Sequence, residues 1–447
     1  MHTQNLGFLA FLVLLAGALL AGGASAAAAP GQPAVRLVAF ASLLLVTLSG
    51  LSPDWRRYRE LFLLLGAILG LVALQLVPLP PAAWTMLPGR AALVEVARAT
   101  GNLDSWRPLA TVPDGAWNAL FSLVVPAAAL IGFACLSDRQ RAMTVPLLLG
   151  VVALSALLGL LQISGEQISS GVGVPFGEAS GLLANRNHQA LLLAIGIPLT
   201  LHTAILEDRL DRGRSALAAG LIIFFILMIV ATGSRAGLAL ALAALLGGML
   251  INRAGLRRVW KGIPPPVAIM LSAGLVALIG GLVFLTMLAG NAEAVFRLFA
   301  MGVGEDMRAR ALPTLMEMIH ESFPVGFGFG SFDAMFRILE PSVLLKRTYF
   351  NHAHNDWLEI VLDGGLFALL LLLAALGWWL WSATQLLRSG APAASRRGLL
   401  GALVLLLILA ASLVDYPART PLMMMVTVIA ACWLSDGSRR PAENVQP

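Results

Sequence analysis

Long apolar runs, repeated along almost the whole chain, constrain the fold more than any other feature of this sequence. Of the 447 residues, 58% are hydrophobic and only 12% are charged, whereas soluble domains carry about 25% charged residues. In a bilayer every backbone polar group must find its partner within the chain, so such runs form helices. The composition excludes a water-soluble globular enzyme and a disordered or collagen-like chain. It predicts an all-α polytopic membrane protein.

Reading the chain in windows of about 20 residues gives about 12 candidate spans, and between ten and twelve once short or interrupted runs are weighed. We therefore expect residues 1–447 to form a single transmembrane domain. The predicted spans are 6–28, 35–51, 61–78, 116–136, 144–162, 189–206, 215–232, 237–251, 267–289, 357–383, 399–414 and 421–434.

The end of the first run, Ala24-Ser25-Ala26, resembles a signal-peptidase site. However, no Lys or Arg precedes this run, and the run is longer than the apolar part of a usual signal peptide. We expect an uncleaved first helix.

The basic residues are concentrated in every second connection between the predicted spans, and this pattern predicts the orientation of the chain in the membrane. They are Arg56, Arg57, Arg59, Arg139, Arg141, Arg209, Arg212, Arg214, Arg253, Arg257, Arg258, Lys261, Arg388, Arg396, Arg397, Arg439 and Arg440. Lys and Arg gather on the cytoplasmic side, so we expect both termini to be cytoplasmic. The net charge of +6 is therefore explained by the membrane topology, and no nucleic-acid partner is implied.

The two cysteines, Cys135 and Cys432, lie within apolar runs, where they are expected to be buried small side chains.

The long connections between spans are predicted on the opposite side of the membrane. The longest of them is a large loop over residues 290–356. Within this loop, Met307 to Ile319 has helical periodicity. Loops of this length are uncommon unless they carry function.

Polar residues gather in four segments on the non-cytoplasmic side. These are Asn185-Arg186-Asn187-His188, Thr232-Gly233-Ser234-Arg235, the long loop with Arg308, Arg310, the glycines 326, 328 and 330 and Asn351-His352-Ala353-His354-Asn355-Asp356, and Asp415-Tyr416-Pro417-Ala418-Arg419.

Each segment also has a structural interpretation. Arg235 could place its charge among lipid headgroups, the spaced glycines could form a turn, and Asn187 and His188 could cap a helix. His352 and His354 could be ordinary surface histidines, and a two-residue spacing does not supply the four ligands of a zinc site. Neither a metal nor a cofactor is expected.

The four segments are stronger evidence for a functional site together than singly, because all four are predicted on the same side of the membrane. Arginines bind phosphate oxygens through paired N–H groups, and a histidine can act as a base near neutral pH. This combination fits a diphosphate leaving group with a general base. If a helix begins near Trp357, then Asp356, Glu359 and Asp363 share one face and need cationic partners. Structural and catalytic roles for these acids are equally open.

The run from Asn351 through Glu359, followed by Gly364-Gly365-Leu366, resembles the His-Asn-led motif of the O-antigen ligase family. That family shares its C-terminal region with lipid-linked polysaccharide polymerases. Four further features also match the family: the Arg235 hairpin, the Asn-Arg-Asn-His segment, Arg308 before the glycine string, and the Asp415 segment. The similarity therefore covers about residues 170–425, and the motifs follow one another in the same order as in the family. Where the family often has a second glycine after Gly365, this chain has Ala368, which is small enough to be tolerated.

The resemblance implies a metal-independent, inverting glycosyltransferase that takes a glycan from undecaprenyl diphosphate on the periplasmic face of the bacterial inner membrane. By position, His354 activates the acceptor hydroxyl, while Arg235 and Arg308 hold the diphosphate. Arg310 is the alternative to Arg308. Further substrate-binding candidates are Arg186, Asn187, His352, Asn355, Asp356 and Arg419.

Three functions are compatible with these features. The first is an O-antigen ligase acting on a lipid A-core acceptor. The second is a polymerase or a protein O-glycan transferase with the same donor, in which the acceptor is a growing glycan or a protein. The third is a secondary transporter, disfavoured because we find no internal repeat and because the long loop breaks the symmetry between two halves.

Overall fold

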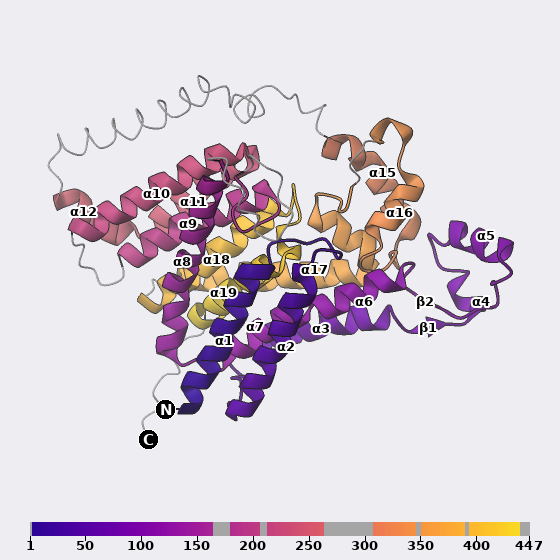
Figure 1. The fold of residues 1–447 in the computed structure, drawn as a ribbon, viewed down its shortest axis with the longest axis horizontal. Coiled ribbons are helices and arrows are strands. Elements are labelled where there is room, and N and C mark those ends of the chain that lie inside the picture. The colour runs from indigo at the N-terminus through magenta and orange to yellow at the C-terminus, as the bar shows by residue number, and fades with distance from the viewer. Residues whose placement is uncertain are drawn as a thin grey trace.

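The computed structural model describes residues 2–163, 179–205, 212–262, 307–345, 350–388 and 393–438. In these ranges the chain is almost wholly α-helical, as predicted, and most helices pack side by side as a bundle (Figure 1). The helices of the bundle are α1 (His2–Ala21), α2 (Gly31–Ser49), α3 (Arg59–Leu74), α6 (Pro113–Ser122), α7 (Val124–Ala134), α8 (Asp138–Ile163), α9 (Arg186–Ala204), α10 (Arg212–Thr232), α11 (Arg235–Ile251), α12 (Arg253–Gly262), α17 (Asp356–Arg388), α18 (Ala393–Ala411) and α19 (Pro421–Ser438).

Seven helical stretches in the described ranges are long and apolar enough to cross a membrane. They are Gln4–Ala21, Gly31–Ser49, Pro113–Ala134, Asp138–Ile163, Gly213–Thr232, Asp356–Arg388 and Pro421–Ser438. The chain is therefore a multi-pass membrane protein. The total of about 12 spans stays a prediction, because α3, α9, α11 and α18 are shorter or more polar and the predicted span 267–289 lies outside the described residues.

The first apolar run is less helical than predicted, since α1 ends at Ala21 instead of residue 28. The residues that follow use their backbone for contacts with distant loops. The carbonyl of Gly22 accepts a hydrogen bond from Leu422 N (3.0 Å), and that of Gly23 accepts one from Ala184 N (3.0 Å). A continued helix would have consumed these carbonyls internally.

Helix α9 occupies the centre of the bundle, in contact with α8, α10, α11 and α18. Every residue from His188 to His202 is buried. A helix that is surrounded by protein can carry polar groups that a lipid-facing helix would exclude. This position explains why α9 combines a polar first turn with an apolar body.

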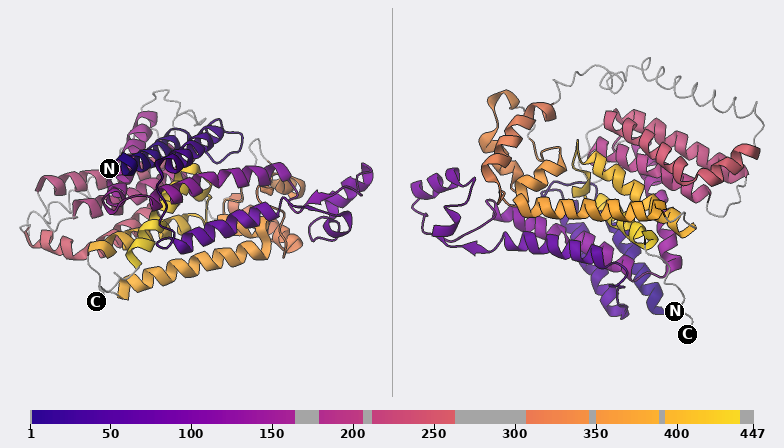
Figure 2. Two further views of the ribbon diagram at one scale, coloured as in Figure 1. Left: turned by 90° about the horizontal axis from the view of Figure 1, so that it is seen from below. Right: turned by 180° about the vertical axis from the view of Figure 1, so that it is seen from behind.

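Charged residues join several helices at the end of the bundle opposite the start of α9. Asp436, near the end of α19, pairs with Arg57 (2.6 Å) and with Arg397 (3.4 Å), and Arg57 also reaches Asp138 (3.3 Å). The side chain of Gln140 donates to the carbonyl of Gln4 in α1 (3.2 Å). The start of α1 and the end of α19 thus lie at the same end of the bundle (Figure 2).

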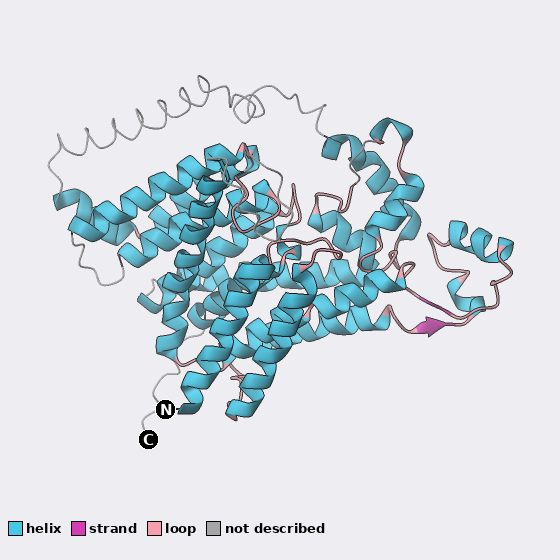
Figure 3. Cartoon of the chain, viewed as in Figure 1, coloured by secondary structure: helices cyan, strands magenta, loops and turns pink. Residues whose placement is uncertain are grey.

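Two short excursions extend from the other end. One is a protruding pair of helices, α4 (Pro81–Trp84) and α5 (Ala91–Ala99), above the two-residue strands β1 (Pro78–Leu79) and β2 (Arg107–Pro108) (Figure 3). The other contains α15 (Met307–Ser322), α16 (Phe332–Leu339) and the 3-10 turn η2 (Ser342–Leu344). Helix α15 confirms the helical periodicity predicted from Met307 onward.

The glycine string after α15 is bonded to the first turns of α17. The amides of Phe327 and Gly328 donate to the carbonyls of Leu362 (2.9 Å) and Asp363 (2.8 Å). Helix α17 is interrupted there, because Gly365 adopts φ 57° and ψ −143°, a region that is essentially limited to glycine. A Cβ atom at Gly365 would also lie 2.1 Å from the Pro324 carbonyl oxygen. The string is therefore a fixed connector and holds the start of α17 in place.

Candidate active site

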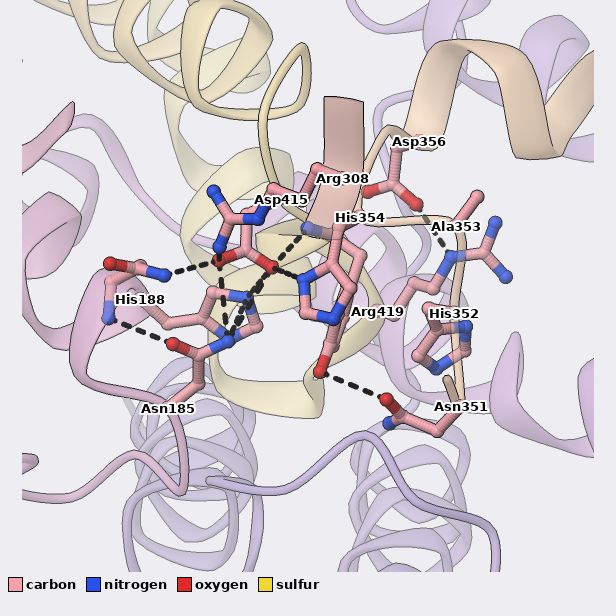
Figure 4. A network of polar contacts seen from close by, with 12 residues as sticks. Asn185, His188, Arg308, Asn351, His352, Ala353, His354, Asp356, Asp415 and Arg419 are labelled. Atoms are coloured by element: carbon pink, nitrogen blue, oxygen red, sulfur yellow. Dashed lines mark hydrogen bonds and ion pairs between the residues drawn. The ribbon is translucent and has the colours of Figure 1, made fainter. Parts of the chain in front are cut away.

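The polar residues singled out from the sequence converge at the end of the bundle where α9, α11 and α17 begin and where α18 connects to α19 (Figure 4). They form two adjoining clusters. One is centred on the carboxylate of Asp415 and the other on the guanidinium of Arg419.

Asp415 is buried and accepts contacts from three different parts of the chain. Its Oδ1 atom lies 3.1 Å from His354 Nδ1 and 3.5 Å from His188 Nε2. Its Oδ2 atom accepts a hydrogen bond from Asn187 Nδ2 (2.8 Å) and lies 3.4 Å from Arg308 Nη2. A carboxylate with this many donors serves as the common anchor of the segments that surround it.

These contacts determine the charge of Asp415. Burial alone would raise the pKa of its carboxyl group, but the hydrogen bonds and positive charge offered by His188 and His354 hold that pKa well below its ordinary value. The carboxylate is therefore ionised at neutral pH and can hold a neighbouring imidazole by one nitrogen.

His354 lies in the turn before α17, with the left-handed backbone angle φ 51°. Since its Nδ1 atom faces an ionised carboxylate, the proton of the neutral ring belongs on Nδ1, which leaves the Nε2 lone pair available as a base. The ring also packs against Tyr416, with centroids 4.9 Å apart. Tyr416 contacts the rings of His188 (5.0 Å) and His352 (4.4 Å) as well. The tyrosine thus fixes the orientation of three imidazoles.

An open cavity, which we name the arginine cavity, brings the three predicted catalytic residues together. Arg235, Arg308 and His354 all line it, with Asn355 beside them. The rest of its wall is apolar and comes from α15, α16, Phe350, Ala353 and the residues Leu413 and Val414 that follow α18. Its volume of about 290 Å³ is close to the lower limit of known ligand pockets, roughly 300–1,000 Å³.

Local structure places both arginines at this cavity. Gly233 has φ 65° and lets the chain turn sharply between α10 and α11, and the Ser234 hydroxyl accepts a hydrogen bond from Gly237 N (3.0 Å) as the N-cap of α11. Arg235 is therefore the first residue of α11. Arg308 is in the first turn of α15, and its side chain contacts Asp415.

Arg419 gathers the acidic face of α17. Its guanidinium bonds Asp356 Oδ1 (2.5 Å) and Glu359 Oε1 (3.0 Å) and lies 4.0 Å from Asp363 Oδ2. Burial would lower the pKa of Arg419, but these carboxylates raise it, so the guanidinium stays charged. Glu359 also accepts from His352 Nδ1 (2.8 Å) and from Ala353 N (2.7 Å). The acids thus find their partner in Arg419 and secure the turn that carries His354.

The remaining predicted site residues are placed differently. Asn355 lines the arginine cavity and also accepts from Leu358 N (3.2 Å) at the start of α17. The Arg310 side chain is exposed and donates to the carbonyl of Val343 (3.2 Å), outside the cavity wall. Arg186 is half-buried at the start of α9 and lines neither this cavity nor the second one described below.

Sequence reasoning missed the residue at the centre of this site. The segment containing Asp415 was recognised, but Asp415 itself was not among the predicted site residues, and neither were Asn185, His188 and Tyr416. Asn185, not Asn187, caps α9 by accepting from Asn187 N (2.8 Å). One signal was present: an acidic residue at a membrane helix end usually has a charged partner, and arginines were available.

The fold and the site together define a multi-pass helical membrane protein with an open cavity where two arginines face a histidine that is bonded to a carboxylate. A family model described as O-antigen ligase matches residues 220–373 of the chain. This segment of the chain is therefore similar to the O-antigen ligase family, in agreement with the resemblance found in its motifs. The matched segment contains Arg235, Arg308 and His354, whereas Asp415 lies beyond it. No match to the chain was found among curated proteins.

Proposed function

We propose that this protein is an inverting glycosyltransferase that moves a glycan from undecaprenyl diphosphate to an acceptor hydroxyl, and that it acts as an O-antigen ligase with a lipid A-core acceptor. The observation that carries the proposal is the arginine cavity, in which His354, Arg235 and Arg308 meet. The similarity of residues 220–373 to the O-antigen ligase family supports the reaction class.

His354 is the proposed general base. Asp415 holds its Nδ1 atom at 3.1 Å, so Nε2 can take the proton of the acceptor hydroxyl. The acceptor oxygen then attacks the anomeric carbon of the donor sugar, and a new glycosidic bond forms. Asp415 stays ionised and stabilises the imidazolium that results, as the carboxylate does in a Ser-His-Asp triad.

The bond between the anomeric carbon and the diphosphate oxygen breaks as the new bond forms, and its electron pair leaves on the diphosphate. Attack opposite to this leaving group inverts the anomeric configuration. Arg235 and Arg308 face the same cavity and offset the charge that develops on the leaving oxygen. Two guanidinium groups can in this way carry out the charge stabilisation that a divalent ion provides elsewhere, which is the basis for proposing a metal-independent reaction.

The surroundings of the cavity support a lipid-linked donor. Its wall includes Leu312, Leu413 and Val414, which are exposed. Apolar side chains beside a cationic centre suit a substrate with a charged diphosphate and an isoprenoid chain. On this proposal the site end of the bundle faces the periplasm and both termini face the cytoplasm, consistent with the positive-inside rule.

The other predicted substrate ligands have graded roles in this proposal. Asn355 contacts substrate from the cavity wall, while Asn187 orients Asp415 through its 2.8 Å hydrogen bond. His352, Asp356 and Arg419 position the His354 turn. Arg186 and Arg310 remain proposed contacts for more distant parts of the donor glycan.

The test compares alanine variants of His354, Arg235 and Arg308 in membranes supplied with lipid-linked glycan. Each should lose transfer by at least about 100-fold, since each removes a base or a charge from the transition state. Arg337→Ala is the control, because it removes the same charge from an exposed pair with Asp333, outside the cavity wall. Full transfer by a correctly inserted His354→Ala variant would overturn the mechanism.

The acceptor is tested separately from the donor. The wild-type protein is supplied with the same donor and either lipid A-core or a lipid-linked repeat unit. Attachment to lipid A-core identifies a ligase, whereas chain extension of the repeat unit identifies a polymerase of the same family.

A further inference from the structure

A second cavity lies beside the site, and the mechanism above does not use it. We name it the alanine cavity, because the α1–α2 connection, residues 23–30, supplies much of its wall through small side chains. The opposite wall consists of Ala184, Asn185, His188, Asn351, Tyr416 and Thr420. Its volume is about 610 Å³, which is within the range of ordinary ligand pockets, roughly 300–1,000 Å³.

The two cavities have no lining residue in common, but Asp415 and Tyr416 each contact residues of both. Asp415 contacts His354 and Arg308 of the arginine cavity and also His188 of the alanine cavity. Tyr416 lines the alanine cavity while its ring packs against His354 at 4.9 Å. A reaction between two substrates needs two binding sites with the reacting groups at their junction, and this arrangement provides them.

The chemistry of the two walls differs. The arginine cavity presents two guanidinium groups, whereas none of the residues that line the alanine cavity in the described ranges is a lysine, arginine, aspartate or glutamate. Its polar lining residues are Ser25, Asn185, His188, Asn351, Tyr416 and Thr420. Hydroxyl, amide and imidazole groups hydrogen-bond the hydroxyls of an uncharged sugar, and they offer little to a diphosphate.

The wall of the alanine cavity is built into the bundle. Besides the Gly22 and Gly23 carbonyl contacts described above, the carbonyl of Ala24 accepts from Gln32 Nε2 (2.7 Å). A Cβ atom at Gly23 would lie 1.9 Å from the Leu182 carbonyl oxygen, so only glycine permits this approach. On the opposite wall, the buried Nδ1 atom of His188 has no hydrogen-bond partner among the described residues. The cavity therefore has a defined shape and an unused polar atom in a residue of its wall.

We propose that the alanine cavity binds an uncharged saccharide portion of the acceptor and directs it toward His354. This inference rests on the proposed transferase function, and it adds the path by which the second substrate reaches the site. Tyr416 then lies between the two, because its ring packs against the base and its side chain lines the cavity of the acceptor.

The α1–α2 connection offers a matched test. Ala26 and Ala28 are exposed and line the cavity, while Ala27 between them is equally exposed and does not line it. Tryptophan is introduced at each position in turn in the full chain. The Michaelis constants of the lipid-linked donor and of a lipid A-core acceptor are then measured for each purified variant, together with its thermal midpoint.

For Ala26→Trp and Ala28→Trp we expect the KM for the acceptor to rise at least about tenfold, with the donor KM unchanged within about twofold, because a filled cavity weakens only the substrate that uses it. Ala27→Trp should retain both constants. Its thermal midpoint also shows whether tryptophan in this connection disturbs folding.

Unchanged acceptor KM in both cavity variants would overturn the inference and leave the proposed function intact. A rise in the donor KM with no change for the acceptor would also overturn it and would assign the cavity to the donor glycan. A correctly inserted wild-type protein that transfers no glycan would instead overturn the proposed function, and this inference with it.

Discussion

The Nδ1 atom of His354 lies 3.1 Å from the Oδ1 atom of Asp415, although 61 residues separate them in the chain. This pair joins the turn before α17 to the connection between α18 and α19. It also decides which nitrogen of His354 is available for chemistry. The predictions that follow begin with this contact.

Replacing Asp415 with asparagine should leave the shape of the site and remove its negative charge. The amide can present the wrong partner to His354 and cannot stabilise the imidazolium, so kcat should fall by about 10²- to 10⁴-fold while the donor KM changes little. Initial rates in purified, inserted protein measure both constants. The control is Asp114→Asn, at an exposed acid in the first turn of α6, which should keep normal rates. An unchanged kcat in Asp415→Asn would refute the role of the pair.

Asp415 should also contribute a characteristic pH dependence to stability. Because the folded protein holds the pKa of Asp415 below its ordinary value, its contribution is complete above about pH 4 and is lost as the pH falls through the lower, folded value. The difference in thermal midpoint between wild type and Asp415→Asn should therefore persist from about pH 7 to pH 5 and shrink only below about pH 4. A difference that vanished between about pH 6 and pH 5 would mean that the folded protein raises this pKa.

Arg419→Ala should be one of the most destabilising substitutions in the chain. It leaves the buried carboxylates of Asp356 and Glu359 without their cation, and removing one partner of a buried pair costs about 3–5 kcal/mol. Unfolding of the purified protein in a titration with SDS measures the loss. The matched control is Arg337→Ala, because Arg337 pairs with Asp333 on an exposed face of α16 and should contribute no more than about 0.5 kcal/mol. Equal losses in the two variants would contradict a structural role for Arg419.

Gly365→Ala tests the break in α17. The alanine would have to adopt a backbone conformation that is essentially limited to glycine, and its Cβ would meet the Pro324 carbonyl, so a loss of about 1–3 kcal/mol or more is expected. Gly377→Ala in the same helix is the control. A Cβ atom there meets nothing within 4 Å, and the change should be neutral or stabilising by about 0.5–1 kcal/mol. Similar stabilities for the two variants would show that α17 tolerates continuous helix at residue 365.

The sequence was most informative about features that depend on neighbouring residues. Apolar length predicted the membrane helices, and the spacing of Asp356, Glu359 and Asp363 predicted that they share one face of α17. The close packing that made Ala368 acceptable is also observed, since a Cβ atom at Gly364 would lie 2.4 Å from the Cβ of Ala368.

What the sequence could not predict depends on pairs that lie far apart in the chain. Nothing local indicates that Asp415 meets Arg308, 107 residues away, or that Arg419 is the cation bound by the acids of α17. The interior position of α9 was equally hidden, because an apolar helix inside a bundle and one facing lipid have similar compositions. The sequence also could not predict which of Arg308 and Arg310 lines the arginine cavity, because the two residues are distinguished only by the orientation of α15.

The position of Asp415 between the last two helices has a consequence for biogenesis. Arg235, Arg308 and His354 are all synthesised earlier, but the carboxylate that fixes the His354 ring arrives only with the connection between α18 and α19. The hairpin of α18 and α19 also packs against α1, α7, α9 and α11. On the proposed mechanism, a nascent chain therefore has no oriented base until the hairpin of α18 and α19 is in the membrane.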